Sequence, residues 1–227
     1  MNTLEHILTN FSDQSIPILE NTLPIQSYVP LDLSADNTEL KDFDITDPES
    51  CQSYIDNILK SKAGKVAYGG YLEVRNLYKD KSGFNQNFGE PRNIHLGIDY
   101  WATEGTEVFT PLNGVVHSFK NNSNVGDYGP TIILEHSLED FVFYTLYGHL
   151  SLESLVGLSI GKKFEAKSVL ATLGNPEINV NYAPHLHFQI IKDLQGSRGD
   201  YPGVCSKQQL DFYRNNCIDP NLLLKIR

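Results

Sequence analysis

Two histidines separated by a single residue, His185 and His187, are the side chains of this sequence best placed to do chemistry. They begin an apolar run, residues 186–191, which is typical of a β-strand. Side chains at positions i and i+2 of a strand point to the same face, roughly 6–7 Å apart along the backbone. One imidazole can therefore bind a metal ion while its neighbour stays free to transfer a proton.

Two upstream segments supply further groups for such a site, His95-Leu-Gly-Ile-Asp99 and Tyr147-Gly-His149-Leu150. Zinc hydrolases need three protein ligands, one open position for water, and a base nearby. Gly97 and the β-rich flanks favour a loop that enters a strand at 95–99 over a helix. The candidates for a zinc hydrolase site are His95, Asp99, His149, His185 and His187.

The elements that must position these residues read as strands from about residue 66 onward. Short runs rich in Val, Ile, Thr, Phe and Tyr are separated by Gly, Asn, Asp and Pro. These runs lie at 107–111, 114–119, 131–136, 142–150, 169–173 and 186–191. Because no helices intervene, the pattern predicts a mainly β fold of antiparallel sheets, sandwich- or barrel-like.

Helical signals lie outside this strand-rich region. Asp47 as N-cap and Pro48 in the first turn predict a helix near 48–62, and a short helix is expected around 3–11. A final helix is expected near 207–215.

We therefore predict an acidic, partly helical N-terminal extension over residues 1–65 and a catalytic domain over 66–227. Whether residues 1–60 cover the active-site groove as a regulatory segment stays open at this point.

Charge and hydropathy narrow the class of protein. The formal net charge is −10, and residues 1–60 hold eleven acidic but only two basic residues. Nucleic-acid binding needs clustered Lys and Arg, so no nucleic-acid partner is expected. No apolar stretch approaches the roughly 20 residues of a membrane span. The N-terminal residues show no basic and apolar signal pattern, which predicts a cytoplasmic location.

The three cysteines, Cys51, Cys205 and Cys217, are too few to define a disulfide framework and lack metal-binding spacing. A pair between Cys205 and Cys217 is conceivable, but a reducing compartment favours free thiols.

Five motifs follow one another in an order that resembles the lysostaphin/LytM-type zinc metallopeptidases. The motifs lie at 95–99, 104–111, 113–116, 147–150 and 185–188, and the resemblance covers about 90–192. Many members of that family cut peptide cross-bridges of peptidoglycan. The resemblance thus implies an antiparallel β-sandwich with its site in a groove on one sheet, and an endopeptidase acting on a peptide or muropeptide.

Carried over residue by residue, the resemblance implies Zn²⁺ bound by His95, Asp99 and His187. It implies His149 and His185 as the two catalytic histidines that do not bind the metal. We expect His185 to be the base, since the strand fixes it beside His187.

Flanking segments are similar to a branch of the family that occurs in cytoplasmic multidomain proteins. These segments are 68–72, 90–92, 127–130 and 202–205. We expect Tyr68, Tyr71 and Arg92 to line the groove, with Arg92 placed to meet a carboxylate.

Two alternatives to a peptidase remain at the level of sequence. One is a zinc-stabilised binding or scaffold module without hydrolytic activity, suggested by the missing export signal and by the unusual segment 174–184. The other is a zinc enzyme that acts on a small non-peptide molecule.

Overall fold

The computed structural model describes residues 3–20, 22–77 and 90–226. Most strands join one large sheet, and β13 pairs with β11 beside the main path. Along the main path the order is β1 (Tyr28–Pro30), β2 (Val66–Gly69), β4 (Ile98–Trp101), β11 (His185–Ile191), β8 (Phe141–Gly148), β7 (Gly129–Leu138), β6 (Gly114–Asn122) and β9 (Lys163–Phe164). β13 spans Cys217–Ile218. The β2 to β9 part of this path is antiparallel, whereas β1 joins β2 in parallel.

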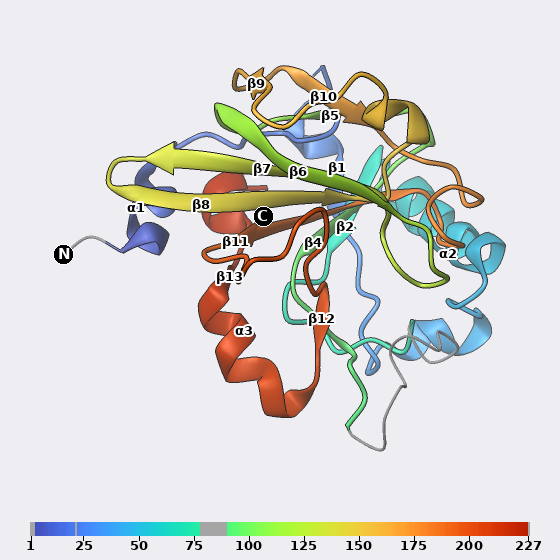
Figure 1. Cartoon of the computed structure of the whole chain (residues 1–227). Helices are drawn as coiled ribbons and strands as arrows, with labels where there is room; N and C mark the ends of the chain where they lie inside the picture. Colours follow the sequence, from blue (N-terminus) through green and yellow to red (C-terminus); the bar gives the residue numbers. More distant parts are fainter. Residues whose placement is uncertain (1–2, 21, 78–89, 227) are drawn as a thin grey trace.

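Two small antiparallel ribbons complete the β structure. One pairs β5 (Glu107–Phe109) with β10 (Val169–Thr172), and the other pairs β3 (Ile94–His95) with β12 (Val204–Cys205). The β5–β10 ribbon lies over the large sheet at the top of Figure 1. Val108 and Leu170 of this ribbon share a buried core with Ile132 and Phe188 of the sheet. The predicted mainly β fold with antiparallel packing is therefore confirmed.

Strand β11 lies at the centre of this arrangement. All seven of its residues are buried, and it pairs with β4 on one side and β8 on the other. His187 lies opposite Asp99 on β4 and opposite Gly148 on β8, while His185 lies opposite Trp101. Strands paired on both edges and buried on both faces hold their side chains in fixed positions. The His-x-His pair therefore lies on a fully buried strand that is paired along both edges.

The helices predicted from sequence are present. The predicted 48–62 helix is α2 (Pro48–Ser61), and Asp47 caps it by accepting the Ser50 N–H at 2.8 Å. The buried face of α2 packs against Trp101. The other helices are α1 (Leu4–Asn10), α3 (Leu210–Asn216) and α4 (Asn221–Leu224), with short 3₁₀ turns at Ile25–Ser27, Thr38–Asp42, Leu152–Leu155 and Lys207–Gln209. Across the ranges given above, no helix is long and apolar enough to cross a membrane.

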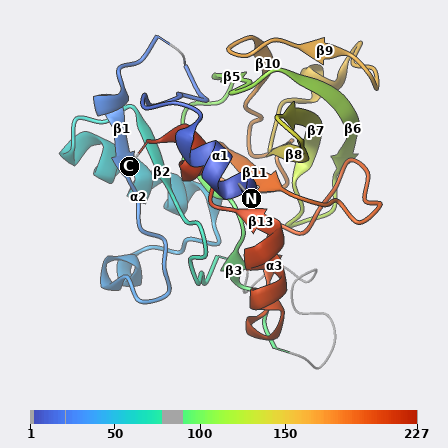
Figure 2. The ribbon, with the colours of Figure 1, turned by 90° about the vertical axis from the view of Figure 1, so that its left-hand side faces the viewer.

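The N-terminal extension packs into the same core as the strands. Leu8 of α1 and Ile18 are fully buried in the cluster that contains Phe188. Figure 2 shows α1 lying beside the C-terminal elements, and the Ile16 N–H donates to Leu224 O at 2.7 Å. The division at residues 65 and 66 stays a prediction, but the two parts share one hydrophobic core.

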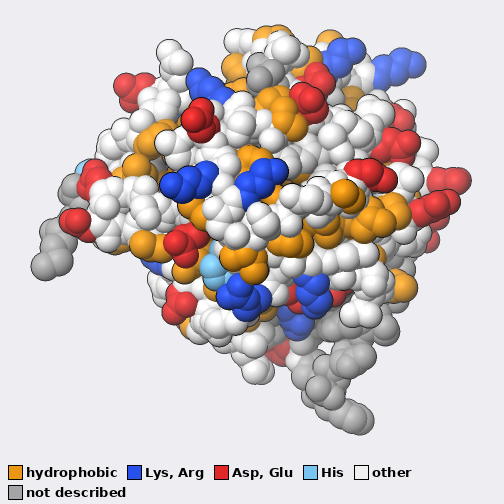
Figure 3. Space-filling model, turned by 45° about the horizontal axis from the view of Figure 1, so that its top comes forward, with side chains coloured by type: hydrophobic (Ala, Val, Ile, Leu, Met, Phe, Trp, Pro, Cys, Tyr) orange, Lys and Arg blue, Asp and Glu red, His pale blue; other side chains and the backbone are white. Residues whose placement is uncertain are grey.

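The charged surface and the cysteines can be compared with the sequence. On the face shown in Figure 3, Lys and Arg side chains lie scattered among Asp and Glu side chains. All three cysteines are buried and unbonded, which agrees with the free thiols expected from sequence.

Because the extension and the strands share one core, we predict that shortening a buried side chain of the extension destabilises the whole chain. Ile18 is fully buried, so Ile18→Ala should lower the free energy of unfolding by about 2–5 kcal/mol. Urea denaturation followed by circular dichroism measures this. Val156→Ala, at a side chain that is 80% exposed, is the control and should change stability by less than about 0.5 kcal/mol. An unchanged main transition in Ile18→Ala would show that the extension folds separately.

Candidate metal centre

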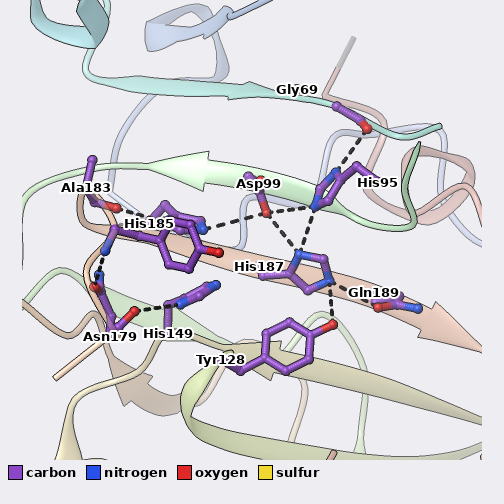
Figure 4. A network of polar contacts seen from close by, with 12 residues as sticks. Gly69, His95, Asp99, Tyr128, His149, Asn179, Ala183, His185, His187 and Gln189 are labelled. Atoms are coloured by element: carbon purple, nitrogen blue, oxygen red, sulfur yellow. Dashed lines mark hydrogen bonds and ion pairs between the residues drawn. The ribbon is translucent and has the colours of Figure 1, made fainter. Parts of the chain in front are cut away.

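Three side chains from β3, β4 and β11 converge on one point (Figure 4). His95 Nε2 lies 2.9 Å from His187 Nδ1 and 3.3 Å from Asp99 Oδ1. His187 Nδ1 lies 3.1 Å from Asp99 Oδ1. All three residues are buried. The structure thus brings together the three candidate ligands expected from sequence, from the short strand β3 and from the paired strands β4 and β11.

The hydrogen bonds on the outer side of each imidazole set which nitrogen faces this point. His95 Nδ1 lies 2.9 Å from Gly70 O, and a carbonyl can only accept, so His95 carries its proton on Nδ1. His187 Nε2 lies 3.0 Å from Gln189 Oε1. The Gln189 amide is oriented because its Nε2 donates to Pro202 O and to Cys217 Sγ. His187 therefore carries its proton on Nε2, and its Nδ1 is an acceptor.

Three acceptor atoms, two imidazole nitrogens and one carboxylate oxygen, consequently face one another with no proton between them. Acceptors held 2.9–3.3 Å apart repel unless a cation lies among them. Two imidazoles and a carboxylate are a donor set for zinc. Zinc bonds of about 2.0–2.1 Å in a tetrahedron place ligand atoms roughly 3.3–3.4 Å apart, close to the separations here. The residues present therefore fit a zinc ion with a fourth position left open.

The charges around the site favour metal binding at neutral pH. Burial, together with the nearby Arg75 guanidinium, lowers the pKa of His95 to about 4, so its imidazole is neutral. Burial alone would raise the pKa of Asp99, but the neighbouring His95 and Arg75 hold it well below its usual range. A neutral imidazole and an ionised carboxylate are the forms that coordinate zinc.

A glycine allows the ligand loop to approach β11 closely. A Cβ atom on Gly97 would lie 2.5 Å from Phe188 O and 2.9 Å from the His187 ring. Any side chain at this position would displace the ring that supplies the third ligand atom. The glycine between His95 and Asp99 is thus required by the packing of the loop.

The two other histidines of the motifs lie next to this centre. The ring centroids of His149 and His185 are 4.2 Å apart, and His185 Nε2 lies 4.0 Å from Asp99 Oδ1. His149 directly follows β8 and has a φ of +60°, which turns the chain so that its ring lies beside His185. Histidine is among the residues enriched in this left-handed region.

Segment 174–184 orients both of these rings. His149 Nδ1 lies 3.3 Å from Asn179 O, and His185 Nδ1 lies 2.7 Å from Ala183 O. Both imidazoles therefore carry their proton on Nδ1, which leaves Nε2 of each as an acceptor. Tyr182 packs edge-on against both rings. Burial lowers the pKa of both histidines, so both are neutral at pH 7.

A cavity of about 370 Å³ opens onto the five residues. Beyond them it is lined by aromatic, acidic and small side chains, including Tyr128, Tyr182, Asp127, Asp200 and Tyr201. Every described residue that lines it falls between 77 and 204. In the described part of the chain, the acidic extension therefore does not cover the groove.

Of the three residues expected to bind substrate, only Arg92 lines this cavity. Tyr68 stacks against Tyr100, with ring centroids 6.3 Å apart, and the Tyr71 hydroxyl donates to Cys217 O at 2.8 Å. Both tyrosines pack against the main hydrophobic core, so the expectation for Tyr68 and Tyr71 is corrected. Arg92 donates to Val204 O at 3.0 Å.

Sequence reasoning missed several residues of the site. Gln189 lies two positions after His187 on the same strand face, so a polar residue in an apolar run was its signal. Arg75 has no such signal, because it precedes Asp99 by 24 residues and belongs to none of the motifs. Tyr128 and Tyr182 lie in segments that were singled out from the sequence, 127–130 and 174–184, but neither tyrosine was assigned to the site.

Comparison with known proteins agrees with this geometry. Residues 93–200 match the family model described as Peptidase family M23. This part of the chain, just under half of it, is similar to the peptidase domains that the family model describes. The matched M23 region contains all three candidate ligands and both further histidines. The predicted resemblance to the lysostaphin/LytM type is thereby confirmed.

Individual relatives of the matched region cover different shares of the chain. An "Uncharacterized metalloprotease" of Haemophilus influenzae is 34% identical over 95 residues, which are 42% of this chain and 18% of that protein. The chain thus spans less than a fifth of that relative. The catalytic domain of the antimicrobial peptidase lysostaphin from Staphylococcus simulans is 23% identical, with a TM-score of 0.42, over 70% of this chain and 88% of that one. The catalytic domain of the prophage-encoded M23 protein EnpA from Enterococcus faecalis is 20% identical, with a TM-score of 0.39. The match covers 61% of this chain and 85% of that one.

Because Gln189 holds the proton of His187 on Nε2, we predict that Gln189 controls metal affinity without binding the metal itself. In Gln189→Met, His187 Nε2 loses its carbonyl acceptor and keeps only the Tyr128 hydroxyl, 3.5 Å away, which can donate as well as accept. The His187 proton can then move to Nδ1 and point at Asp99. Zinc binding should then weaken about 10–100-fold, as measured by competition with a chromogenic chelator. Gln208→Met, an exposed glutamine, is the matched control. Equal zinc affinity of the two variants would show that Gln189 does not set the tautomer.

Proposed function

We propose that this chain is a zinc-dependent metallopeptidase that hydrolyses a peptide bond. The observation that carries the proposal is the convergence of three acceptor atoms, from His95, Asp99 and His187, beside two imidazoles whose Nε2 atoms carry no proton. The match of residues 93–200 to a peptidase family supports the same reaction class. The related metalloprotease of Haemophilus influenzae supports a metal-dependent one.

The residues divide the work of peptide hydrolysis between them. A bound zinc ion would supply Lewis acidity, which polarises a carbonyl group and makes water more acidic. His185 Nε2 is an acceptor close to the ligand Asp99, so we assign it the proton taken from the attacking water. The proton that His185 takes up passes from its Nε2 to the leaving amine. His149, whose ring lies beside that of His185 and whose Nε2 is also an acceptor, is assigned the second hydrogen bond from the attacking water.

The substrate that we propose is a peptide of the peptidoglycan type. The order of the sequence motifs supports it, because it resembles enzymes that cut such cross-bridges. The cavity beside the candidate ligands is lined by tyrosines and by Arg92, and such a lining suits a peptide with polar groups.

Metal dependence is the first test of this proposal. The purified chain should bind about one zinc ion, cleave components of a muropeptide digest, and release products that mass spectrometry identifies as hydrolysed peptides. Removal of the metal with a chelator should abolish cleavage, and added zinc should restore it. A peptide complex that stays intact over long incubation would indicate the non-hydrolytic binding module instead.

The two histidines that do not bind the metal give a second test. His149→Asn and His185→Asn remove the proton-accepting nitrogen, and asparagine tolerates the left-handed backbone at position 149. Each should lower kcat about 10²–10⁴-fold while zinc content stays at the wild-type value. His117→Asn, a half-buried histidine away from the cavity, is the control. Full turnover in either active-site variant would contradict the assigned roles.

A further inference from the structure

We propose that Arg75 is a positioning residue of the metal centre and that it connects the N-terminal extension to the ligand Asp99. The inference rests on the metal site of the proposed function. It concerns residues 33–35 and 70–75, which lie outside the stretch 93–200 that matches the peptidase family.

The Arg75 side chain is fully buried and bridges two carboxylates. Its Nη1 donates to Asp99 Oδ2 at 2.5 Å, and its Nε donates to Glu73 Oε2 at 2.5 Å. The other oxygen of Asp99, Oδ1, faces His95 and His187. The two oxygens of one carboxylate are thus assigned to different partners, one to the guanidinium and one to the metal site.

This division decides how Asp99 can bind a metal ion. A carboxylate with both oxygens available can bind through either or both of them, which raises the coordination number. With Oδ2 held by a charge-assisted hydrogen bond, only Oδ1 remains available. Arg75 therefore keeps Asp99 monodentate and leaves a coordination position open for water and substrate.

Arg75 also reaches the catalytic side of the site through Trp101. Its guanidinium carbon lies 5.6 Å from the centroid of the Trp101 ring, within range of a cation–π contact. Trp101 in turn stacks on His185, with ring centroids 5.7 Å apart and ring planes inclined by 25°. One buried arginine thus contacts a metal ligand and the residue that supports the assigned base.

The N-terminal extension holds the segment that carries Arg75. Glu73 Oε1 accepts the Leu33 N–H at 3.3 Å, and the Ala35 N–H donates to Val74 O at 2.7 Å. Ser34 forms a β-bridge with Arg75 itself. A chain of contacts therefore runs from the extension through Glu73 and Arg75 to Asp99.

Gly70 shows how closely the backbone is fitted around this side chain. It has a φ of +108°, and a Cβ atom there would lie 1.8 Å from Arg75 Nη2. The carbonyl of the same residue accepts the Nδ1 proton of His95. The turn at Gly70 thus accommodates the arginine and orients a metal ligand.

A cation beside a metal site also has an unfavourable effect, because it repels the metal ion. Glu73 offsets this repulsion by pairing with the same guanidinium. The remaining contribution of Arg75 is orientation of the Asp99 carboxylate, and outer partners of this kind usually affect metal affinity 10–100-fold.

The test compares full-length Arg75→Met with Arg198→Met, which removes the same charge from an exposed site. Zinc affinity is measured by chelator competition, and coordination by the visible absorption of the cobalt-substituted protein. Four-coordinate cobalt(II) absorbs much more strongly than five- or six-coordinate cobalt(II). We expect about 10–100-fold weaker zinc binding in Arg75→Met and a cobalt spectrum that loses intensity, with both unchanged in Arg198→Met.

The outcomes separate this inference from the proposed function. A wild-type chain that binds neither metal refutes the proposed metal site itself. A wild-type chain that binds both, with a folded Arg75→Met of equal affinity or unaltered cobalt spectrum, refutes only the role of Arg75.

Circular dichroism reports whether Arg75→Met folds. If it does not fold, the same zinc-affinity and cobalt-spectrum measurements are made on Arg75→Lys and Glu73→Gln. The lysine keeps the charge without the two-armed geometry, and the glutamine removes the second carboxylate while leaving Arg75 in place. Weaker zinc binding with an altered cobalt spectrum in these variants supports the inference, and wild-type behaviour of both overturns it.

Discussion

The constraint on which this site depends is the mutual repulsion of three lone pairs. His95 Nε2, His187 Nδ1 and Asp99 Oδ1 point at one another from 2.9–3.3 Å, and such an arrangement is tolerated only where the surrounding protein enforces it. The fold enforces it by placing the ligands on a doubly paired, fully buried strand, on the strand opposite, and on a short loop that a glycine lets approach. The same enforcement makes the site a good host for a cation.

A common device fixes the chemistry of all four histidines. Each imidazole meets a carbonyl oxygen on its outer nitrogen, from the backbone at Gly70, Asn179 and Ala183, or from the Gln189 side chain. Because a carbonyl can only accept, each proton is held on the outside and each lone pair on the inside. Two lone pairs then face the metal position and two face the cavity.

Sequence reasoning reached the parts of this protein that depend on short-range pattern. The strand at His187, the loop at His95 and the cap at Asp47 follow from local spacing and side-chain chemistry, and the motif order supplied the assignment of roles. Arg75 could not be found in this way, since its partner Asp99 is distant in the sequence and a lone arginine has no periodic signature. Tyr71 shows the reverse error: a tyrosine beside glycines read as a groove residue, whereas tertiary packing places it on the core.

Strand β1 has a further consequence for the behaviour of the whole molecule in solution. It is only three residues long, ends at an exposed proline, and covers the outer edge of β2 at one side of the large sheet. An uncovered strand edge is a template for pairing with another chain, and a short strand that ends in proline is a poor one. Tyr28–Pro30 therefore covers the outer edge of β2, the strand next to the one that carries the candidate ligand Asp99, and leaves a poor template for pairing with a second chain on that side of the sheet.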